Sequence, residues 1–327
     1  MPNGPTGSTV TVFHALTVDS LPRFVTMPGT SGAIHPQLGR NFMSMMATGH
    51  YRPQWTWVAE QDGMVVARAA WWGSPQASHP SALDWLDLPP GPHGVAVGAD
   101  LLRHAHTQVR TGDGRRPEFH LFLPDGWARL ADAKANRARM AAARRAGLTA
   151  KLDRWHLTWL SDRSLPTTAG RLHYRSISAE DDALLLHLLH RILQGTLDFY
   201  SAEDIAAQGI DETARRDLEY LGSFQSPREW WRLGTDGEGT PVGVVMPARN
   251  SEHAIIAYLG VVPEKRGNGY GLDLLLEGTR TLRALGIEEI HADTDVSNTP
   301  MAAAFRAAGY RFSVHKVLRD GTHAAHT

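Results

Sequence analysis

Residues 255–271 read I-I-A-Y-L-G-V-V-P-E-K-R-G-N-G-Y-G, and this stretch predicts a strand that leads into a helix. The apolar run 255–262 has a β-branched residue at four of its eight positions, which is typical of a strand buried on both faces. Pro263 ends the strand, and an apolar stripe from Leu272 onward predicts the helix. Unpaired amides at a helix N-terminus attract anions, and glycines let a phosphate approach the backbone closely. The junction therefore predicts a pyrophosphate site, with Arg266 as its cation.

The spacing of the glycines separates this loop from other phosphate loops. A Walker loop requires Lys and then Ser or Thr after its last glycine, but Leu and Asp follow Gly271. A dinucleotide fingerprint requires G-x-G-x-x-G, whereas Gly267, Gly269 and Gly271 give G-x-G-x-G. Arg266, Gly269 and Gly271 instead match Q/R-x-x-G-x-G/A. The loop thus resembles the acetyl-CoA motif of the GNAT superfamily of N-acetyltransferases.

A second segment resembles the same family. Residues 288–298, E-E-I-H-A-D-T-D-V-S-N, alternate as a half-buried strand does. Asn298 or Thr299 is suited to cap a following helix, and Gly309 to end it. The stretch 298–310, N-T-P-M-A-A-A-F-R-A-A-G-Y, resembles the GNAT pattern N-x-x-A-x-x-x-Y-x-x-x-G-F. Both motifs occur in the family's order and at about its spacing, so residues 170–320 resemble a GNAT domain.

Composition excludes several other classes of protein. The chain has 327 residues, 42% of them hydrophobic, which predicts two domains with ample cores. A net charge of −1 gives no general attraction for nucleic acid. The absence of cysteine removes disulfides, thiolate metal sites and a cysteine acyl-enzyme, and the 17 histidines show no convincing metal spacing. Without a long apolar span or a signal-peptide pattern, we expect a cytoplasmic protein that contacts no membrane.

An internal repeat predicts the domain organisation. Residues 85–102 align with residues 258–275 at a constant offset of 173. We therefore expect an α/β (α+β) mixed-sheet fold of two tandem GNAT domains. The predicted boundaries are 1–162 for a degenerate N-terminal domain, 163–170 for a linker and 171–327 for the catalytic domain. In the first copy His93 and Ala96 replace the cation and the middle glycine, so we expect catalysis in the second; whether the first binds coenzyme A stays open.

The GNAT resemblance implies that acetyl-CoA (coenzyme A) donates its acetyl group directly to an amine in a ternary complex. It also implies an oxyanion held by a backbone amide of the strand before the loop. Val261 is the candidate for this amide, with Leu259 or Gly260 as alternatives. The expected cofactor contacts are Val261, Val262, Arg266, Gly267, Asn268, Gly269, Tyr270, Gly271, Asn298 and Phe305.

Proton transfer is the part of the chemistry that the sequence leaves most open. An alkylammonium with a pKa of ~10 must lose a proton before it attacks. Family members often place a glutamate where this chain has Ile255, and a tyrosine acid where it has Phe305. The candidate bases are Glu252 or the adjacent His253, Tyr258, and Asp295 or Asp293 on the same strand face, acting directly or through water. Tyr310 is either the replacement acid or a packing aromatic; Ser297 and solvent are the other donors.

Acceptor specificity is expected from the variable region before residue 229. Carboxylates beside aromatic rings suit an ammonium group, and the candidates are Asp198, Tyr200 and Glu219. The predicted function is N-acetylation of a primary amine on a small molecule by a monomer (a pseudo-dimer) or a homodimer. The alternatives are acetylation of an antibiotic or peptide N-terminus, or a catalytically silent acyl-CoA sensor.

Overall fold

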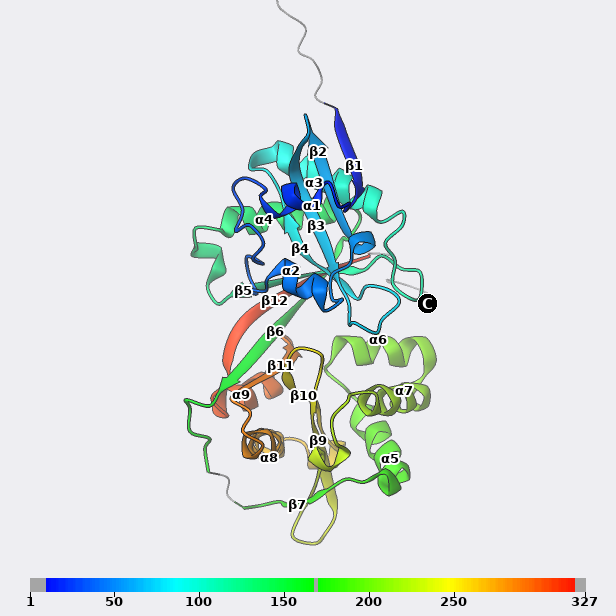
Figure 1. Cartoon of the computed structure of the whole chain (residues 1–327). Helices are drawn as coiled ribbons and strands as arrows, with labels where there is room; N and C mark the ends of the chain where they lie inside the picture. Colours follow the sequence, from blue (N-terminus) through cyan, green and yellow to red (C-terminus); the bar gives the residue numbers. More distant parts are fainter. Residues whose placement is uncertain (1–9, 168–169, 321–327) are drawn as a thin grey trace, which may run out of the picture. The chain divides into compact units, whose positions relative to one another are not determined.

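The computed structural model describes residues 10–167 and 170–320 (Figure 1). The N-terminal stretch 1–9, residues 168 and 169 of the predicted linker, and the C-terminal tail 321–327 lie outside the described residues. None of the helices in the described part is long and apolar enough to cross a membrane. The chain divides into two compact units, one running up to Asp153 and again from His315 onward, the other comprising Arg154–Val314.

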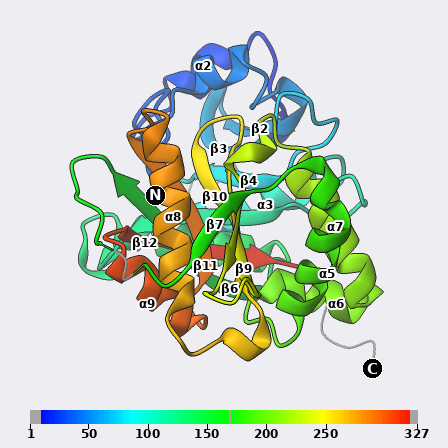
Figure 2. The same cartoon turned by 90° about the horizontal axis from the view of Figure 1, so that it is seen from below.

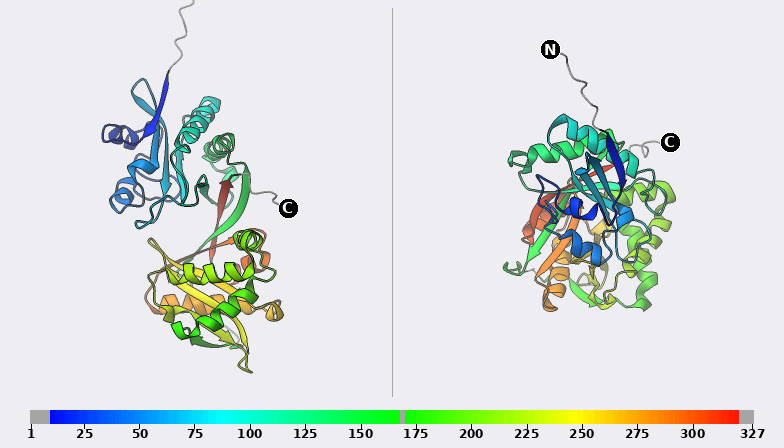
Figure 3. Two further views of the ribbon diagram at one scale, coloured as in Figure 1. Left: turned by 90° about the vertical axis from the view of Figure 1, so that its right-hand side faces the viewer. Right: turned by 45° about the horizontal axis from the view of Figure 1, so that its top comes forward.

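The first unit has helices on both faces of its strands (Figure 3, left). Its strands are ordered β1-β2-β3-β4-β5-β12. Phe24 of α1 and Phe42 of α2 pack on Val58 and Trp85 of the sheet, while α3 and α4 cover the other face. The elements are β1 (Thr11–Ala15), α1 (Leu21–Val25), α2 (Phe42–Ala47), β2 (Thr56–Gln61), β3 (Met64–Trp72), β4 (Ala82–Asp87), α3 (Gly91–Ala105), β5 (Glu118–Pro124), α4 (Ala133–Arg145) and the start of β6 (Ala150–Leu160).

The second unit also places helices on both faces of a sheet, with strand order β6-β11-β10-β9-β8-β7. Helices α8 and α9 lie on one side of β9 and β10, and α5, α6 and α7 on the other (Figures 1 and 2). The elements are β7 (His173–Ser176), α5 (Asp182–Leu193), α6 (Phe199–Gln208), α7 (Ile210–Gly222), β8 (Arg232–Thr235), β9 (Pro241–Arg249), β10 (Ala254–Val261), α8 (Tyr270–Ala284), β11 (Glu289–Asp295), α9 (Thr299–Ala307) and β12 (Arg311–Arg319).

The side chains of β9 contribute to the apolar clusters on both faces of this sheet. Val242 and Val245 belong to the apolar cluster beneath α8 and α9, whereas Val244 and Met246 belong to the cluster beneath α5 and α7. A strand buried on both faces needs apolar residues at nearly every position. Burial of each such side chain stabilises the fold by roughly 1.5–3 kcal/mol.

The two units do not follow the predicted boundary at 163–170. Most of β6 belongs to the second unit, where it pairs antiparallel with β11 from Arg154 opposite Asp295 to Leu160 opposite Glu289. The end of β12 belongs to the first unit, where it lies beside β5 and His315 stacks on Phe122 with ring centroids 4.2 Å apart. Each unit thus completes its sheet with a strand from the other half of the sequence.

The predicted repeat appears as two matching strand–loop–helix segments, β4–α3 and β10–α8. In the second unit, β10 pairs in parallel with β11 only at Ala254 and Ile255, before an irregularity that follows Ile256. In the first unit, β4 pairs in parallel with β5 only at Ala82 and Leu83. Each pair of strands then separates, which opens a gap beside the loop and its helix.

Candidate functional site

The glycine loop has the geometry expected of a phosphate cradle. Gly267 and Gly269 adopt φ values of +79° and +78°, in the left-handed region that glycine occupies at little cost. Helix α8 begins directly afterward at Tyr270, with Gly269 as its N-cap. The first amides of a helix have no carbonyl partner within it, so they face the loop. The predicted strand, loop and helix are therefore all present in this order.

Arg266 does not provide the cation that the sequence predicted for this cradle. Its guanidinium donates instead to carbonyl oxygens at the end of α5, at 2.6 Å to Ile192 and 2.8 Å to Gln194. A further bond of 3.1 Å runs from its Nε to the carbonyl of Val261. A cation near the last carbonyls of a helix satisfies groups that lack partners. Arg266 thus fixes the end of α5 to the end of β10.

We expect Arg266→Ala to lower the free energy of unfolding by roughly 1–2 kcal/mol, because several bonds to carbonyl groups are lost. Acetyl-CoA affinity should change less than about threefold. Thermal unfolding and calorimetric titration would measure both effects. Arg191→Ala is the matched control, since Arg191 forms an exposed pair with Glu264 that contributes little to stability. A tenfold loss of affinity at unchanged stability would restore the phosphate role.

Arg171 is a cation that lies beside this loop, and no sequence motif had indicated it. Its guanidinium lies 5.0 Å from the ring of Tyr270, and it donates to the Asn268 carbonyl at 2.7 Å and to Asp273 at 2.6 Å. A Cβ added to Gly269 would lie 3.3 Å from an Arg171 nitrogen. Arg171 precedes β7, about 100 residues from the loop, so no local motif could have indicated it.

The edge of β10 that faces the gap carries the predicted oxyanion amide. Val262 donates its amide to the Val242 carbonyl of β9 at 3.0 Å. Since backbone groups alternate in direction along a strand, the amides of Val261 and Leu259 face the opposite edge, toward the gap. The predicted pairing of Val262 with the cofactor arm does not fit the structure. The Val262 amide is bonded within the sheet, and the Val262 side chain is buried.

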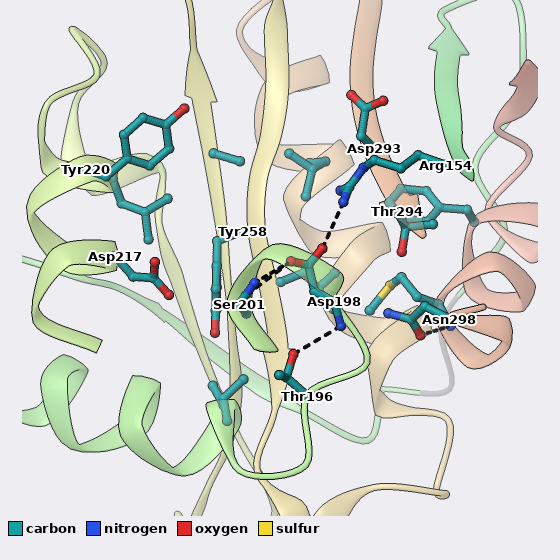
Figure 4. Close-up of a pocket in the computed structure, with 17 residues that line it drawn as sticks. Arg154, Thr196, Asp198, Ser201, Asp217, Tyr220, Tyr258, Asp293, Thr294 and Asn298 are labelled. Atoms are coloured by element: carbon teal, nitrogen blue, oxygen red, sulfur yellow. Dashed lines mark hydrogen bonds and ion pairs between the residues drawn. The ribbon is translucent and has the colours of Figure 1, made fainter. Parts of the chain in front are cut away.

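A pocket of about 320 Å³ lies beside this edge, within the second unit (Figure 4). Asp217 and Tyr220 lie on the side formed by α7, while Asp293 and Asn298 lie on the opposite side. Its apolar lining includes Ile192, Leu221, Ile256, Leu259, Met301 and Phe305. Its charged lining residues are Arg154, Asp198, Asp217 and Asp293, three acids and one base. The pocket thus suits a small molecule with a cationic group.

Arg154 and Asp295 form a buried support for this pocket. Arg154 binds Asp295 at 2.7 Å and Asp198 at 3.2 Å, and Asp198 caps α6 by accepting the Ser201 amide at 3.0 Å. Asp295 also accepts the Phe199 amide at 2.5 Å and is only 1% exposed. Burial raises the pKa of Asp295, against the opposing effect of Arg154. Asp295, a predicted base, therefore holds the start of α6 and does not line the pocket.

Of the predicted acceptor residues, the structure places Asp198 in the pocket but not Tyr200 or Glu219. Tyr200 lies against Arg154, 5.3 Å from ring centroid to guanidinium, and Glu219 is exposed. Asp217 takes the place expected for Glu219. Helix periodicity contained this signal: Asp217 is four residues from Thr213 and from Leu221, both buried, so the three share one stripe of α7.

Asp217 has an unusual electrostatic environment. Burial raises its pKa to about 6, and the nearby carboxylates of Asp204 and Asp198 add to this effect. Unlike Asp198 and Asp295, it has no arginine partner in the part of the chain that the structure describes. Burial and neighbouring carboxylates destabilise the charged form of Asp217. A bound ammonium group would stabilise that form by supplying the opposite charge.

The other predicted bases have different surroundings. Tyr258 lines the pocket, but burial raises its pKa and the carboxylates of Asp217 and Asp198 raise it further, so the phenol stays neutral and cannot accept a proton at pH 7. Glu252 lies in the turn between β9 and β10, where its amide donates to Asn250, and it does not line the pocket.

Phe305 and Asn298 line the pocket as the family pattern implies, but Tyr310 does not. Asn298 caps α9 by accepting the Met301 amide at 3.3 Å. The Tyr310 hydroxyl is buried and lies 2.8 Å from the Thr279 hydroxyl, and its ring packs against Phe305 with centroids 4.9 Å apart. Tyr310 therefore has a packing role, and the predicted alternative of a proton donor does not fit its position.

For Tyr310→Phe we expect kcat to stay within about twofold of the wild type. Loss of the buried hydrogen bond to Thr279 should lower the free energy of unfolding by about 1 kcal/mol. Steady-state kinetics and chemical denaturation would measure these. A large fall in kcat without loss of stability would make Tyr310 the acid after all.

The matching segment of the first unit is built differently. Its loop contains Pro90 and Pro92, which have no amide hydrogen to offer a phosphate. A Cβ added to Gly94 would lie 1.7 Å from the Pro89 carbonyl oxygen, so the loop backbone packs closely on itself. These features support the expectation that the second unit is the catalytic one.

In the first unit a pocket of about 640 Å³ lies beside this loop, and a side chain of α4 that lines it binds the end of β4. Arg139 of α4 donates to the Leu86 carbonyl at 2.6 Å and to Asp87 at 2.9 Å. Leu86 is the counterpart of Leu259 in the repeat. The Leu86 carbonyl occupies the position that would face a cofactor arm, and it already accepts a hydrogen bond from Arg139.

Part of the chain is similar to known acetyltransferase sequences. Residues 194–310 match the acetyltransferase (GNAT) family, so this part of the chain is a GNAT acetyltransferase domain. The mycothiol acetyltransferase of Pseudarthrobacter chlorophenolicus is 34% identical over 84 residues. Those residues are 24% of this chain and 26% of that relative, so the match spans about a quarter of its length.

Two solved structures resemble nearly the whole chain. A GCN5-related N-acetyltransferase from Sphaerobacter thermophilus has a TM-score of 0.58 at 15% identity, covering 95% of this chain and 96% of its own. A tandem GNAT protein from the clavulanic acid biosynthesis pathway has a TM-score of 0.50 at 17% identity, covering 95% and 99%. At these identities the likeness concerns the fold: the chain has the GNAT fold in a tandem arrangement.

Proposed function

We propose that this protein transfers the acetyl group of acetyl-CoA directly to a primary amine of a small molecule. The observation that carries the proposal is the acidic pocket at the open gap between β10 and β11. Three carboxylates line it beside the free edge of β10. A cationic amine would thus be drawn to the same place where a thioester can meet the backbone amides of that edge.

Each part of the site has a role in this reaction. The amides at the start of α8 and the Arg171 guanidinium would hold the cofactor's pyrophosphate. The amides of Val261 and Leu259 would hold the cofactor arm and the oxyanion that forms when the amine attacks. Asp217 would bind the ammonium form of the acceptor, because its carboxylate is charged at neutral pH and lacks an arginine partner among the described residues.

The test is a thiol-release assay with the purified chain, acetyl-CoA and a panel of primary amines. The panel should include a diamine, an amino sugar, an aminoglycoside and a dipeptide. We expect amine-dependent thiol release and a product whose mass is larger by one acetyl group. Acetyl-CoA binding without thiol release for any amine would instead favour the silent sensor. Product only with the aminoglycoside or the dipeptide would favour the antibiotic or peptide alternative.

A further inference from the structure

Four side chains on β11 and β6 form a continuous series of hydrogen bonds. Glu289 Oε1 lies 2.9 Å from His291 Nε2, and His291 Nδ1 lies 3.1 Å from His156 Nε2. His156 Nδ1 lies 3.3 Å from Asp293 Oδ1. Asp293 lines the acidic pocket with its side chain 38% exposed, and the Glu289 side chain at the other end is 54% exposed. The series, here called the histidine chain, therefore connects the pocket with the surface.

Strand register places these groups together. Glu289, His291 and Asp293 are alternate residues of β11, so their side chains share one face. Asp293 is directly opposite His156, and His291 is opposite Thr158. His156 is thus the diagonal neighbour of His291, a position within reach of a long side chain. Figure 4 shows the Asp293 end of this face next to Arg154.

Counting protons shows what the histidine chain needs. Three hydrogen bonds require three protons, and two neutral imidazoles supply one each. Neutral rings with hydrogen on Nε2 satisfy the bonds from His156 to His291 and from His291 to Glu289. The contact between His156 and Asp293 then has no proton, and it is the longest of the three. The histidine chain is complete only when one more proton enters at Asp293.

The surroundings favour movement of that proton away from His291. Burial lowers the pKa of His291 and His156 lowers it further, against the opposing effect of Glu289 and Asp293. The His253 ring also lies against His291, with centroids 4.1 Å apart. On the pocket side the charged neighbour is Arg154, which is bound to Asp295 and Asp198. His291 therefore passes a proton on more readily than it keeps one.

We propose that the histidine chain carries the proton released by the acceptor amine from Asp293 to the surface at Glu289. The inference rests on the proposed acetyl transfer. The ammonium gives one proton to Asp293, which passes it to His156 Nδ1. The Nε2 proton of His156 then moves to His291 Nδ1, and the Nε2 proton of His291 moves to Glu289 and water. Exchange with solvent returns both rings to their first form.

The remaining steps balance the reaction. The neutral amine adds its electron pair to the thioester carbonyl carbon, and the carbon–sulfur bond breaks to release a thiolate. The thiolate takes the second proton of the attacking nitrogen, directly or through water. Each turnover thus converts one ammonium and one acetyl-CoA into one amide, one free thiol and one proton. The histidine chain removes that last proton while substrate fills the pocket.

The experiment compares His156→Gln and His291→Gln with the wild type, using the panel amine that gives the highest turnover. We expect kcat at pH 7 to fall about 10- to 100-fold in each variant. The loss should shrink as pH rises, because more of the amine is then neutral in solution. Added imidazole should restore part of kcat in His156→Gln. Acetyl-CoA affinity should stay within about twofold of the wild type. A purely structural role would give neither the pH dependence nor the rescue.

His190→Gln is the matched control, because His190 pairs with Asp211 on the surface of the same unit and is not among the pocket residues. Its kcat and pH profile should equal those of the wild type. Wild-type kcat and pH profile in both His156→Gln and His291→Gln would overturn the proton path. An equal fall in kcat at every pH, without rescue by imidazole, would overturn it too. Wild-type protein that acetylates no amine would refute the proposed function instead.

Discussion

Gly269→Val should raise the dissociation constant for acetyl-CoA at least about 100-fold. Valine is strained at a φ of +78°, and its Cβ would meet Arg171 at 3.3 Å. The substitution would thus disturb both the loop backbone and the cation beside it. Loss of several charge-assisted bonds of about 1.5–3 kcal/mol each exceeds the 2.7 kcal/mol that corresponds to a 100-fold change.

Calorimetric titration would measure this loss, with circular dichroism to confirm that the variant is folded. Gly271→Ala is the control at the same helix start. Gly271 is not among the glycines with positive φ, and a Cβ there would meet nothing within 4 Å. We expect its affinity to stay within about threefold. Wild-type affinity in folded Gly269→Val would mean that the loop does not hold the cofactor.

Asp217→Asn should lower kcat/KM for the acceptor amine about 10- to 100-fold at pH 8, because a charged partner for the ammonium is removed. At pH 5 the difference should nearly vanish, since a group with a pKa of about 6 is mostly protonated there. Wild-type kcat/KM should therefore rise as pH passes through about 6, and the variant should lack this step. Equal kcat/KM at pH 8 would contradict the assignment.

Glu219→Gln, on the same helix, provides the comparison. Glu219 is the residue that the sequence favoured, but it is exposed and is not among the pocket residues, so we expect less than a twofold change. If Glu219→Gln lowers kcat/KM and Asp217→Asn does not, the sequence-based assignment is the better one.

Asp217→Asn should also change stability, in a direction fixed by the raised pKa. The folded protein holds the Asp217 proton more tightly than the unfolded chain, whose Asp has a pKa near 3.8. The contribution of Asp217 to the free energy of unfolding of the wild type is therefore fully present below pH 3.8. It is lost as the pH rises through about 6. Relative to the wild type, Asp217→Asn should gain on the order of 1 kcal/mol between pH 4 and pH 8, after allowance for solvent screening.

Local sequence patterns predicted the parts of the fold that depend on local interactions. Apolar runs, alternation and capping residues indicated β10, α8, β11 and α9. The internal repeat indicated the second copy of the β10–α8 segment, at β4–α3. These signals act over 10 to 20 residues, and the elements form wherever such a pattern is buried.

Interactions between residues far apart in the sequence could not be predicted from local patterns. The Arg266 match to the motif was correct as a pattern, yet the carbonyls of α5 bind its guanidinium. The histidine chain depends on which strand lies beside β11, and β6 comes from the half of the sequence that the repeat assigns to the first domain. A period-2 pattern identifies the face of a strand but not its neighbour.

The shared strands also have a consequence for biosynthesis. β5 ends at Pro124, and the part of β12 that belongs beside it begins at His315, about 190 residues later. At typical elongation rates of about 5–20 residues per second, the nascent first unit keeps that edge of β5 open for roughly 10–40 seconds. An open edge can pair with another chain. A ribosome pause or a chaperone that shields this edge would therefore favour pairing of β5 with its own β12 over pairing with another chain.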